Sequence, residues 1–169
     1  IDGGSALLAA HLPRHLKGKG ADLGAGWGWL AAQILTRPEV RELHLVEAEA
    51  LALDCARLNV TDQRAVFHWA DANSFQPGKA LDFVVMNPPF HIGRADAASL
   101  GQSFIRAAAR ALKPGGTLVV NLDDALGRDL ARDAGMPTLT IGLNETADVT
   151  AKLLERSPSE QTFLLTAGP

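Results

Sequence analysis

The residues of this sequence best suited to chemistry are four consecutive ones, Asn87-Pro88-Pro89-Phe90. They follow an apolar run, Leu81–Met86, that predicts a buried strand. An Asn at the end of such a strand can present an amide oxygen. The next proline fixes the direction of its own carbonyl because its φ is locked, and Phe90 adds a ring face. This combination suits the methylation of an exocyclic amine on a nucleobase.

A second motif lies upstream and weighs against a simpler interpretation of the first. Because Asn-Pro commonly starts a turn, the first motif alone is equally compatible with a strand, a turn and a core Phe90. The upstream run Asp22-Leu23-Gly24-Ala25-Gly26-Trp27-Gly28 ends a short predicted strand and opens a helix. Its glycines permit a tight turn and the close approach of a ligand to the backbone.

An acidic residue ends the next predicted strand, Leu43–Glu47. Glu47 follows Gly28 by 19 residues, the spacing at which a carboxylate binds the ribose hydroxyls of a nucleoside. The glycine turn lacks the Lys-Ser/Thr pair of a triphosphate site, so ATP is not favoured. A domain that binds ATP or NAD through the same turn stays open as an alternative, which calorimetry with these ligands would separate.

The composition predicts a soluble protein. The 169 residues, 47% of them apolar, suffice for one domain with a sizeable core. Because no apolar stretch reaches the length of a membrane span and no signal peptide is visible, we expect a cytoplasmic location and no membrane partner. The single Cys55 excludes an internal disulfide and is expected to be a small buried helix residue. Since the chain begins with Ile1, we expect it to be a fragment.

The charge is unevenly distributed along the chain. Residues 1–122 carry 12 Lys or Arg against 11 Asp or Glu, and residues 123–169 carry 4 against 8. The net charge of −3 does not favour nucleic-acid binding. Arg94, close to the Asn-Pro-Pro-Phe motif, is the best candidate for a phosphate contact. The later basic residues are more simply a solvated helix face: Arg106, Arg110 and Lys113.

Strands and helices alternate along the chain. The predicted strands are Ala21–Leu23, Leu43–Glu47, Ala65–Ala70, Leu81–Met86, Thr117–Leu122, Thr138–Ile141 and Thr162–Thr166. The predicted helices are Ser5–Leu12, Trp27–Leu35, Ala50–Asn59, Leu100–Leu112, Ala125–Ala134 and Ala147–Leu154. This alternation predicts an α/β fold: a Rossmann-like, doubly wound, mostly parallel sheet of about seven strands in a single domain, 1–169.

Polar residues lie at the ends of four predicted strands. Ligands of such sheets bind beyond the carboxyl ends of the strands, and four polar residues there are hard to ascribe to core formation: Asp22, Glu47, Asp71 and Asn87. The five histidines lack metal-ligand spacing, so no metal site is predicted. His91, beside the Asn-Pro-Pro-Phe motif, is a candidate for lining a base pocket.

With both motifs present, residues 1–118 resemble the class I methyltransferases that use S-adenosylmethionine (SAM). More narrowly, they resemble the catalytic half of the ribosomal RNA guanine-N2 methyltransferases of the small-subunit type. The matching segments are Asp2–Ser5, Ala21–Gly28, Leu45–Ala48, His68–Ala72, Asn87–Arg94, Leu100–Ile105 and Leu112–Gly116. The resemblance implies SAM as cofactor and ribosomal RNA as partner.

The same resemblance implies residue roles. The glycine turn would surround the amino-acid end of SAM, Glu47 would bind its ribose and Asp71 would lie near its adenine. The implied cofactor-binding residues are Asp22, Gly24, Ala25, Gly26, Gly28, Glu47, Asp71 and Ala72. The implied catalytic residues are Asn87, Pro88 and Phe90, and the implied substrate residues are Pro89, His91 and Arg94.

Two departures from the family pattern set further expectations. Family members usually carry an additional, related amino-terminal domain, so RNA binding by this chain is expected to be incomplete. The match also fades beyond the strand Thr117–Leu122, and residues 119–169 faintly resemble the end of the central domain of Mur ligases, which are ATP-dependent. A chimera with its junction near 119–123 and a divergent natural tail are therefore both open.

Several functions stay open on the sequence alone. The first is methylation of an exocyclic nucleobase amine, most simply guanine N2 in ribosomal RNA. The second is a chimeric or truncated scaffold that folds and binds SAM without catalysis, which a methyl-transfer assay would separate from the first. A methyltransferase for adenine in DNA or for a small amine is a closer alternative. The oligomeric state is not determined.

Overall fold

The computed structural model describes residues 3–87, 94–121, 137–142, 148–156 and 161–167. Its helices are α1 (Gly3–His11), α2 (Trp29–Leu35), α3 (Ala50–Asn59) and α4 (Arg94–Ala111). Its strands are β1 (Gly18–Leu23), β2 (Val40–Glu47), β3 (Ala65–Trp69), β4 (Leu81–Met86), β5 (Leu112–Asn121), β6 (Thr138–Gly142), β7 (Val149–Arg156) and β8 (Gln161–Ala167).

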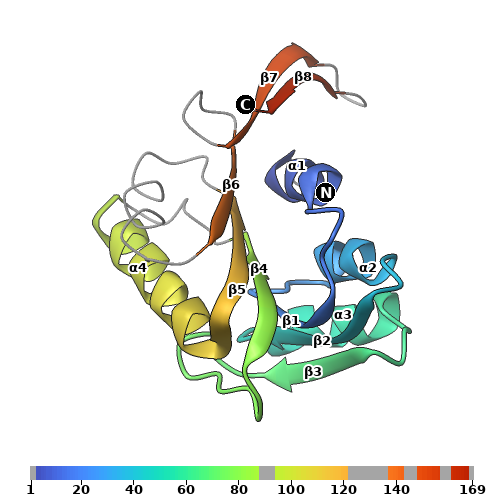
Figure 1. Ribbon diagram of the computed structural model, residues 1–169, viewed down its shortest axis with the longest axis vertical. Coiled ribbons are helices and arrows are strands. Elements are labelled where there is room, and N and C mark those ends of the chain that lie inside the picture. The colour runs from blue at the N-terminus through green and yellow to red at the C-terminus, as the bar shows by residue number, and fades with distance from the viewer. Residues whose placement is uncertain (1–2, 88–93, 122–136, 143–147, 157–160, 168–169) are drawn as a thin grey trace.

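The strands form one eight-stranded sheet in the order β3-β2-β1-β4-β5-β6-β7-β8. Neighbouring strands are parallel from β3 to β7, and only the β7–β8 pair is antiparallel. The chain runs outward from β1 to β3 and then returns to place β4 on the other side of β1 (Figure 1). The switch point of this doubly wound sheet, where ligands usually bind, therefore lies between the ends of β1 and β4.

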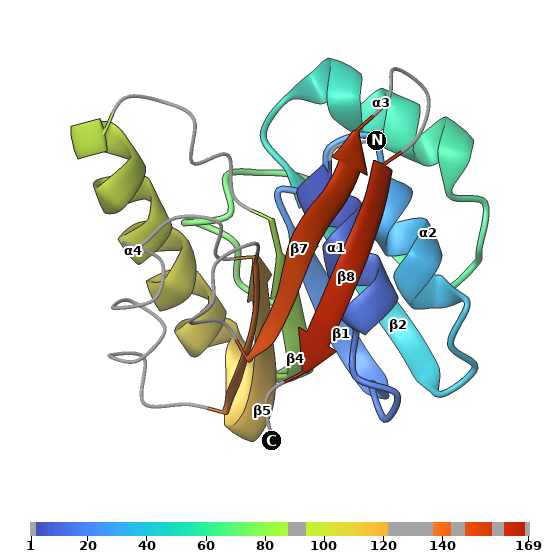
Figure 2. The same ribbon diagram turned by 90° about the horizontal axis from the view of Figure 1, so that it is seen from above.

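Helices cover both faces of the sheet, with α1, α2 and α3 on one face and α4 on the other (Figures 1 and 2). The alternation of side chains along buried strands creates two cores. Leu45, Val85 and Val119 belong to the core under α1 and α2. Their chain neighbours point the opposite way and pack with Phe104 and Ile105 of α4. The segments 84–86 of β4 and 118–120 of β5 are apolar on both faces because both faces are covered.

The predicted fold class is confirmed, and most element bounds agree within a few residues. The helix Ala50–Asn59 and the strand Leu81–Met86 have the predicted bounds. The helix predicted from Leu100 begins at Arg94, because its Ala-rich first turns also favour a helix. The sheet has eight strands rather than about seven. The predicted helix Ala125–Ala134 lies outside the described residues.

The helix predicted over Ala147–Leu154 is wrong, because Val149–Arg156 is strand β7. Its alanine and leucine residues favoured a helix locally. In the structure the segment pairs with β8 from Val149 opposite Ala167 to Arg156 opposite Gln161. Ladder pairing of this kind overrides a weak local propensity. Cys55 is also not buried as expected but exposed on α3.

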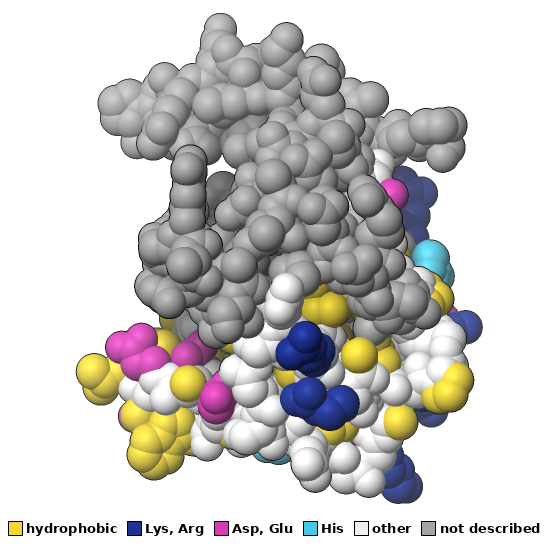
Figure 3. Space-filling model, turned by 90° about the vertical axis from the view of Figure 1, so that its left-hand side faces the viewer, with side chains coloured by type: hydrophobic (Ala, Val, Ile, Leu, Met, Phe, Trp, Pro, Cys, Tyr) yellow, Lys and Arg dark blue, Asp and Glu magenta, His cyan; other side chains and the backbone are white. Residues whose placement is uncertain are grey.

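The surface carries mixed charge. Figure 3 views the side on which α4 lies, and its basic side chains do not form one continuous patch among the described residues. Within the described part of the chain, no helix is long and apolar enough to cross a membrane.

Two histidines pair on neighbouring strands, and their protonation should affect stability. His44 Nδ1 lies 2.8 Å from His68 Nε2, and His44 Nε2 lies 3.2 Å from Glu42 Oε1. Burial lowers the pKa of both histidines. For His44, neighbouring Glu42 opposes this shift.

The folded chain therefore favours neutral rings, and it binds fewer protons than the unfolded chain near the ordinary histidine pKa. We expect stability to be fully present above about pH 6.5 and to fall as the pH drops below that value. Thermal unfolding of a His68→Gln variant should show a weaker decline between pH 7.5 and 5.5 than the unmodified chain. The exposed His15→Gln variant is the control. Equal declines in His68→Gln and the unmodified chain would contradict this role of the pair.

Candidate functional site

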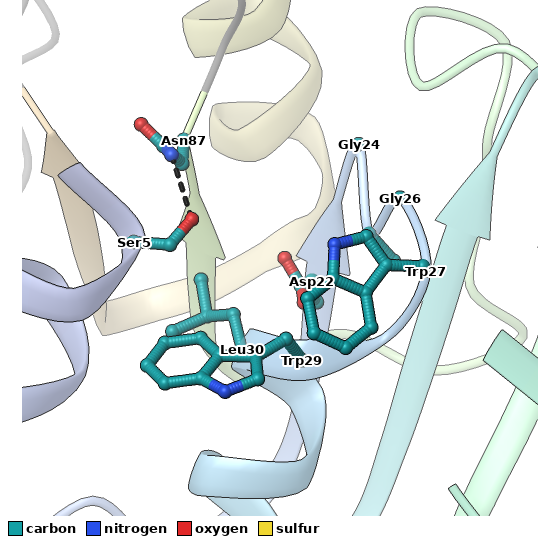
Figure 4. Close-up of a pocket in the computed structure, with 9 residues that line it drawn as sticks. Ser5, Asp22, Gly24, Gly26, Trp27, Trp29, Leu30 and Asn87 are labelled. Atoms are coloured by element: carbon teal, nitrogen blue, oxygen red, sulfur yellow. Dashed lines mark hydrogen bonds between the residues drawn. The ribbon is translucent and has the colours of Figure 1, made fainter. Parts of the chain in front are cut away.

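A pocket lies at the switch point, beyond the ends of β1 and β4 (Figure 4). One wall is the glycine turn after β1, and the opposite wall is formed by α1 and the end of β4. The residues that line it are Ser5, Asp22, Gly24, Ala25, Gly26, Trp27, Trp29, Leu30 and Asn87. The two sequence motifs thus meet in one pocket, although Gly28 and Asn87 are 59 residues apart in the sequence.

Asp22 is the most unusual residue of this pocket. It lies in β1 between Ala21 and Leu23, which both face α4, so its own side chain points toward α1 and α2. It is 1% exposed, and its Oδ2 atom has no hydrogen-bond partner among the described residues. Burial, and secondarily the nearby charge of Glu47, raise the pKa of Asp22 to about 7.

A buried carboxylate oxygen without a donor is costly to keep in a core position. A cation bound in the pocket would supply the missing partner. The predicted cofactor carries an α-ammonium group and a positively charged sulfur, so the charge of the pocket fits it. The described residues contain no cluster of three or more His, Cys, Asp or Glu that could hold a metal ion.

The glycine turn is held by backbone hydrogen bonds to β2. The N–H groups of Gly24 and Ala25 donate to the Val46 carbonyl at 2.9 and 3.1 Å. Gly26 has φ 54°, and a Cβ atom there would have no neighbour within 4 Å. The turn therefore leaves open space in front of the backbone, as close approach of a ligand requires.

Gly28 has a different role, because it does not line the pocket. A Cβ atom there would lie 2.8 Å from Val60 Cγ2 and 3.1 Å from Ala56 Cβ, and its φ is 86°. Its missing side chain lets the start of α2 approach the end of α3. In the structure, Gly28 therefore permits the packing of two helices and does not line the pocket.

Glu47 ties the glycine turn to the turn after β2. Its Oε2 accepts a hydrogen bond from Gly26 N at 2.8 Å, and its Oε1 accepts one from Glu49 N at 2.9 Å. Each carboxylate oxygen can accept a further hydrogen bond. The carboxylate is therefore held in place and keeps capacity for the hydroxyls of a ribose, although Glu47 does not itself line the described pocket.

Replacing Glu47 by Ala should weaken SAM binding by about 1.5–3 kcal/mol, since it removes a charge-assisted contact. Isothermal calorimetry would measure the loss. Glu49→Ala is a matched control, because it removes an exposed carboxylate from the same turn and keeps the backbone N–H that Glu47 binds. Unchanged SAM affinity in Glu47→Ala would refute the ribose role.

Asn87 follows β4 and faces the pocket with Ser5 of α1 (Figure 4). Its Nδ2 donates to Ser5 Oγ at 2.9 Å. Its Oδ1 accepts from Nδ2 of Asn121, at the end of β5, at 2.8 Å. The side-chain amide is therefore hydrogen-bonded at both ends.

The remaining predicted site residues fall into two groups. Asp71 is exposed and organises its own turn by accepting from Asn73 N and Asn73 Nδ2, both at 2.9 Å. Neither Asp71 nor buried Ala72 lines the pocket, although Ala70 N bonds the Glu47 carbonyl and so keeps this turn beside β2. Pro88, Pro89, Phe90 and His91 lie outside the described residues. Arg94 begins α4, and its side chain is not described.

The structure also adds residues to which the sequence assigned no role: Ser5, Trp27, Trp29 and Leu30 in the pocket, and Asn121 behind it. An aromatic residue inside a glycine turn was a visible signal for Trp27, which is 45% exposed. Ser5 ends the family-like segment Asp2–Ser5, which gave it no role, and no local pattern distinguishes Asn121.

Known proteins resemble this chain in sequence over most of its length. The ribosomal RNA large subunit methyltransferase G of Shewanella amazonensis is 41% identical over 125 residues, which cover 70% of this chain and 32% of that protein. The ribosomal RNA small subunit methyltransferase C of Salmonella choleraesuis is 34% identical over 119 residues, which cover 70% of this chain and 35% of that protein. The chain thus spans about a third of the length of these relatives.

Solved structures confirm the fold. The SAM-dependent methyltransferase SibL, in its apo form, matches 98% of this chain and 54% of its own, with a TM-score of 0.64 and 17% identity. The N-methyltransferase NodS of Bradyrhizobium japonicum, solved with S-adenosylhomocysteine, matches 69% of this chain and 58% of its own, with a TM-score of 0.56 and 18% identity.

The family follows from a match that begins at the first residue. The family model described as the methyltransferase small domain covers residues 1–133, further than the resemblance over 1–118 that the motifs indicated. Together with the two ribosomal RNA methyltransferases, this match confirms the predicted resemblance. The chain belongs to the methyltransferase small domain family.

Proposed function

We propose that this chain is the catalytic part of a SAM-dependent ribosomal RNA methyltransferase that modifies an exocyclic amine, most simply N2 of guanine. One observation carries the proposal: the unpartnered buried carboxylate of Asp22 and the amide of Asn87 line the same pocket at the switch point of the sheet. SAM, the predicted cofactor, is the cofactor of this family of enzymes.

The cofactor end of the pocket is suited to a charged nucleoside. Asp22 would face the positive charge of the cofactor, and the glycine turn, which is open at Gly26, would admit its amino-acid end. Glu47, held by Gly26 and Glu49, would bind the ribose hydroxyls. Asp71 and Ala72, at the next strand end, are proposed to lie near the adenine. When bound, SAM supplies a methyl group activated by its positively charged sulfur.

The target end of the pocket is suited to an amine. An exocyclic amine is a poor nucleophile because its lone pair is delocalised into the ring. Hydrogen bonds from the amine to the Asn87 oxygen and the Pro88 carbonyl would favour a more tetrahedral nitrogen and would stabilise the positive charge that grows there. Phe90 would stack on the base and hold it in line. The base must be unpaired or flipped out to enter.

The nature of the substrate is supported by two relatives named as ribosomal RNA methyltransferases. The choice of guanine N2 is supported by the Asn-Pro-Pro-Phe motif and its resemblance to the guanine-N2 enzymes. Pro89, His91 and Arg94 are proposed to contact the RNA beside the target base. A ribosomal RNA methyltransferase of this kind would act in the cytoplasm.

The test is methyl transfer from isotopically labelled SAM to unmodified ribosomal RNA, followed by digestion to nucleosides and mass spectrometry. We expect label in N2-methylguanosine. Label in 6-methyladenosine would replace guanine by adenine as the target. SAM binding without transfer to RNA, DNA or nucleosides would favour the scaffold alternative and overturn the proposed reaction.

The chain alone should bind ribosomal RNA poorly even where it binds SAM well. Its net charge is −3, and the described face around α4 has no continuous basic patch (Figure 3). Filter-binding titrations at 50 and 200 mM salt would measure the affinity and its salt dependence, which reports the number of phosphate contacts. Tight binding at moderate salt would contradict this expectation.

A further inference from the structure

Three polar side chains from distant parts of the chain form one connected row at the target end of the pocket. Ser5 comes from α1, Asn87 follows β4 and Asn121 ends β5. Asn87 and Ser5 are 82 residues apart, and Asn87 and Asn121 are 34 residues apart. Asn121 is only 5% exposed. Only the tertiary fold brings the three together.

The row has a direction. The nitrogen end of the Asn87 amide donates to Ser5 Oγ at 2.9 Å, and Figure 4 shows that its oxygen points away from Ser5. That oxygen accepts from Nδ2 of Asn121 at 2.8 Å. With Asn121 in its observed orientation, a half-turn of the Asn87 amide would exchange its donor and acceptor ends and set nitrogen against nitrogen. The Ser5 hydroxyl can donate or accept and therefore anchors the amide in either orientation, whereas Asn121 in its observed orientation distinguishes between the two.

We propose that Ser5 and Asn121 are positioning residues: Ser5 anchors the Asn87 amide, and Asn121 orients it with its oxygen as the acceptor for the target amine. A carbonyl oxygen has two lone pairs, so the bond from Asn121 does not by itself prevent the same oxygen from accepting a bond from the substrate amine. The role in catalysis rests on the proposed function, whereas the arrangement of the three side chains is seen in the structure itself.

The magnitudes support this role. The hydrogen bond from Asn121 favours the observed orientation by roughly 2- to 12-fold, so the reversed orientation is the minor one. Burying the amide of Asn121 beside Val120 costs free energy that an apolar side chain at the same place would not. Its polar character is explained if it orients Asn87.

Asn121→Asp provides a sharp test because it keeps the shape of the side chain and replaces the donor nitrogen by an acceptor oxygen. At pH 8 the Asn87 amide should turn and donate to the new carboxylate. The two side-chain amide protons of Asn87, identified as those missing from the NMR spectrum of Asn87→Ala, should shift in Asn121→Asp. They should also shift in Ser5→Ala and return toward their original positions in Ser5→Thr, which keeps the hydroxyl.

The kinetic test uses the same variants. We expect kcat to fall roughly 100-fold in Asn121→Asp, as for a misplaced transition-state donor or acceptor, and less in Asn121→Leu, which adds no competing acceptor. Ser5→Ala should lower kcat by roughly 2- to 12-fold, and Ser5→Thr should restore it. The KM for SAM should be unchanged. Thr36→Ala, which removes a hydroxyl bonded to the Gln33 carbonyl on the surface, is the control.

The outcomes separate positioning from a merely structural role. Unmoved Asn87 amide resonances in both Asn121→Asp and Ser5→Ala would overturn the proposal. So would losses of kcat that only follow losses of thermal stability, without rescue by Ser5→Thr. If the unmodified chain transfers no methyl group, the proposed function fails, and the NMR comparison still decides whether Ser5 and Asn121 orient Asn87.

Discussion

Replacing Asn87 by Ala should reduce methyl transfer by roughly 100-fold or more, as expected when an acceptor that stabilises the transition state is lost. The affinity for SAM should change little, because Asn87 belongs to the target end of the pocket and Asp22, Gly26 and Glu47 to the cofactor end. Single-turnover transfer from labelled SAM would measure the rate, and calorimetry the affinity.

Asn87→Ala is also expected to lower the stability of the fold. The variant leaves Ser5 and Asn121 without their bonds to Asn87, so a loss of about 1–3 kcal/mol in unfolding free energy is expected. If the variant instead mainly unfolded the domain, the simple interpretation of this segment as a strand end and turn would be correct. A folded variant that transfers methyl groups at the original rate would remove Asn87 from the mechanism.

Replacing Asp22 by Asn should stabilise the cofactor-free protein at alkaline pH while it weakens SAM binding. The pKa of Asp22 is raised from 3.8 to about 7 in the folded chain, so the folded state holds a proton that the unfolded state has released. Its stabilising contribution is full below about pH 3.8 and is lost as the pH rises through about 7. At pH 8 the isosteric variant should therefore be more stable, by as much as about 4 kcal/mol.

Denaturant unfolding of the unmodified chain and of Asp22→Asn between pH 4 and 8 would measure this difference. The comparison at each pH also cancels the opposite contribution of His44 and His68, which is lost toward acid. The affinity of the unmodified chain for SAM should fall below about pH 7, since the ionised carboxylate is the form that binds a cation. Parallel stability profiles, or equal SAM affinity in the two proteins, would contradict the role of Asp22.

The alternation of strands and helices could be predicted because it depends on local hydrophobic patterns. The same patterns located Asp22, Glu47 and Asn87, since a polar residue that follows a buried apolar run is visible in the sequence. Strand β7 could not be predicted, because its conformation depends on pairing with β8 rather than on its own residues. The packing role of Gly28 could not be predicted either, because it depends on the contact between Gly28 and α3.

The support behind the site was not visible in the sequence either. The bonds from Gly26 and Glu49 to Glu47, and the bonds from Asn87 to Ser5 and from Asn121 to Asn87, join side chains and backbone across the sheet. Sequence motifs identify the groups that could meet a ligand, whereas the fold determines which neighbours orient them.

The tail of the chain completes the sheet beyond β5. Ile141 of β6 is fully buried in the core shared with α1 and α2, and β7 and β8 extend the sheet as a hairpin. The family match extends into the predicted tail, to residue 133. The junction near 119–123 and the Mur-ligase-like origin of the last segment stay predictions.

The most direct test of the central claim is a crystal structure of this chain with S-adenosylhomocysteine. We expect the ribose hydroxyls to lie within hydrogen-bonding distance of the Glu47 carboxylate. We also expect the amino-acid end to lie against Asp22 and the Gly24–Gly26 turn, with the sulfur facing the side of the pocket formed by Asn87. A ligand bound elsewhere, or with its ribose away from Glu47 and its sulfur away from Asn87, would contradict this claim.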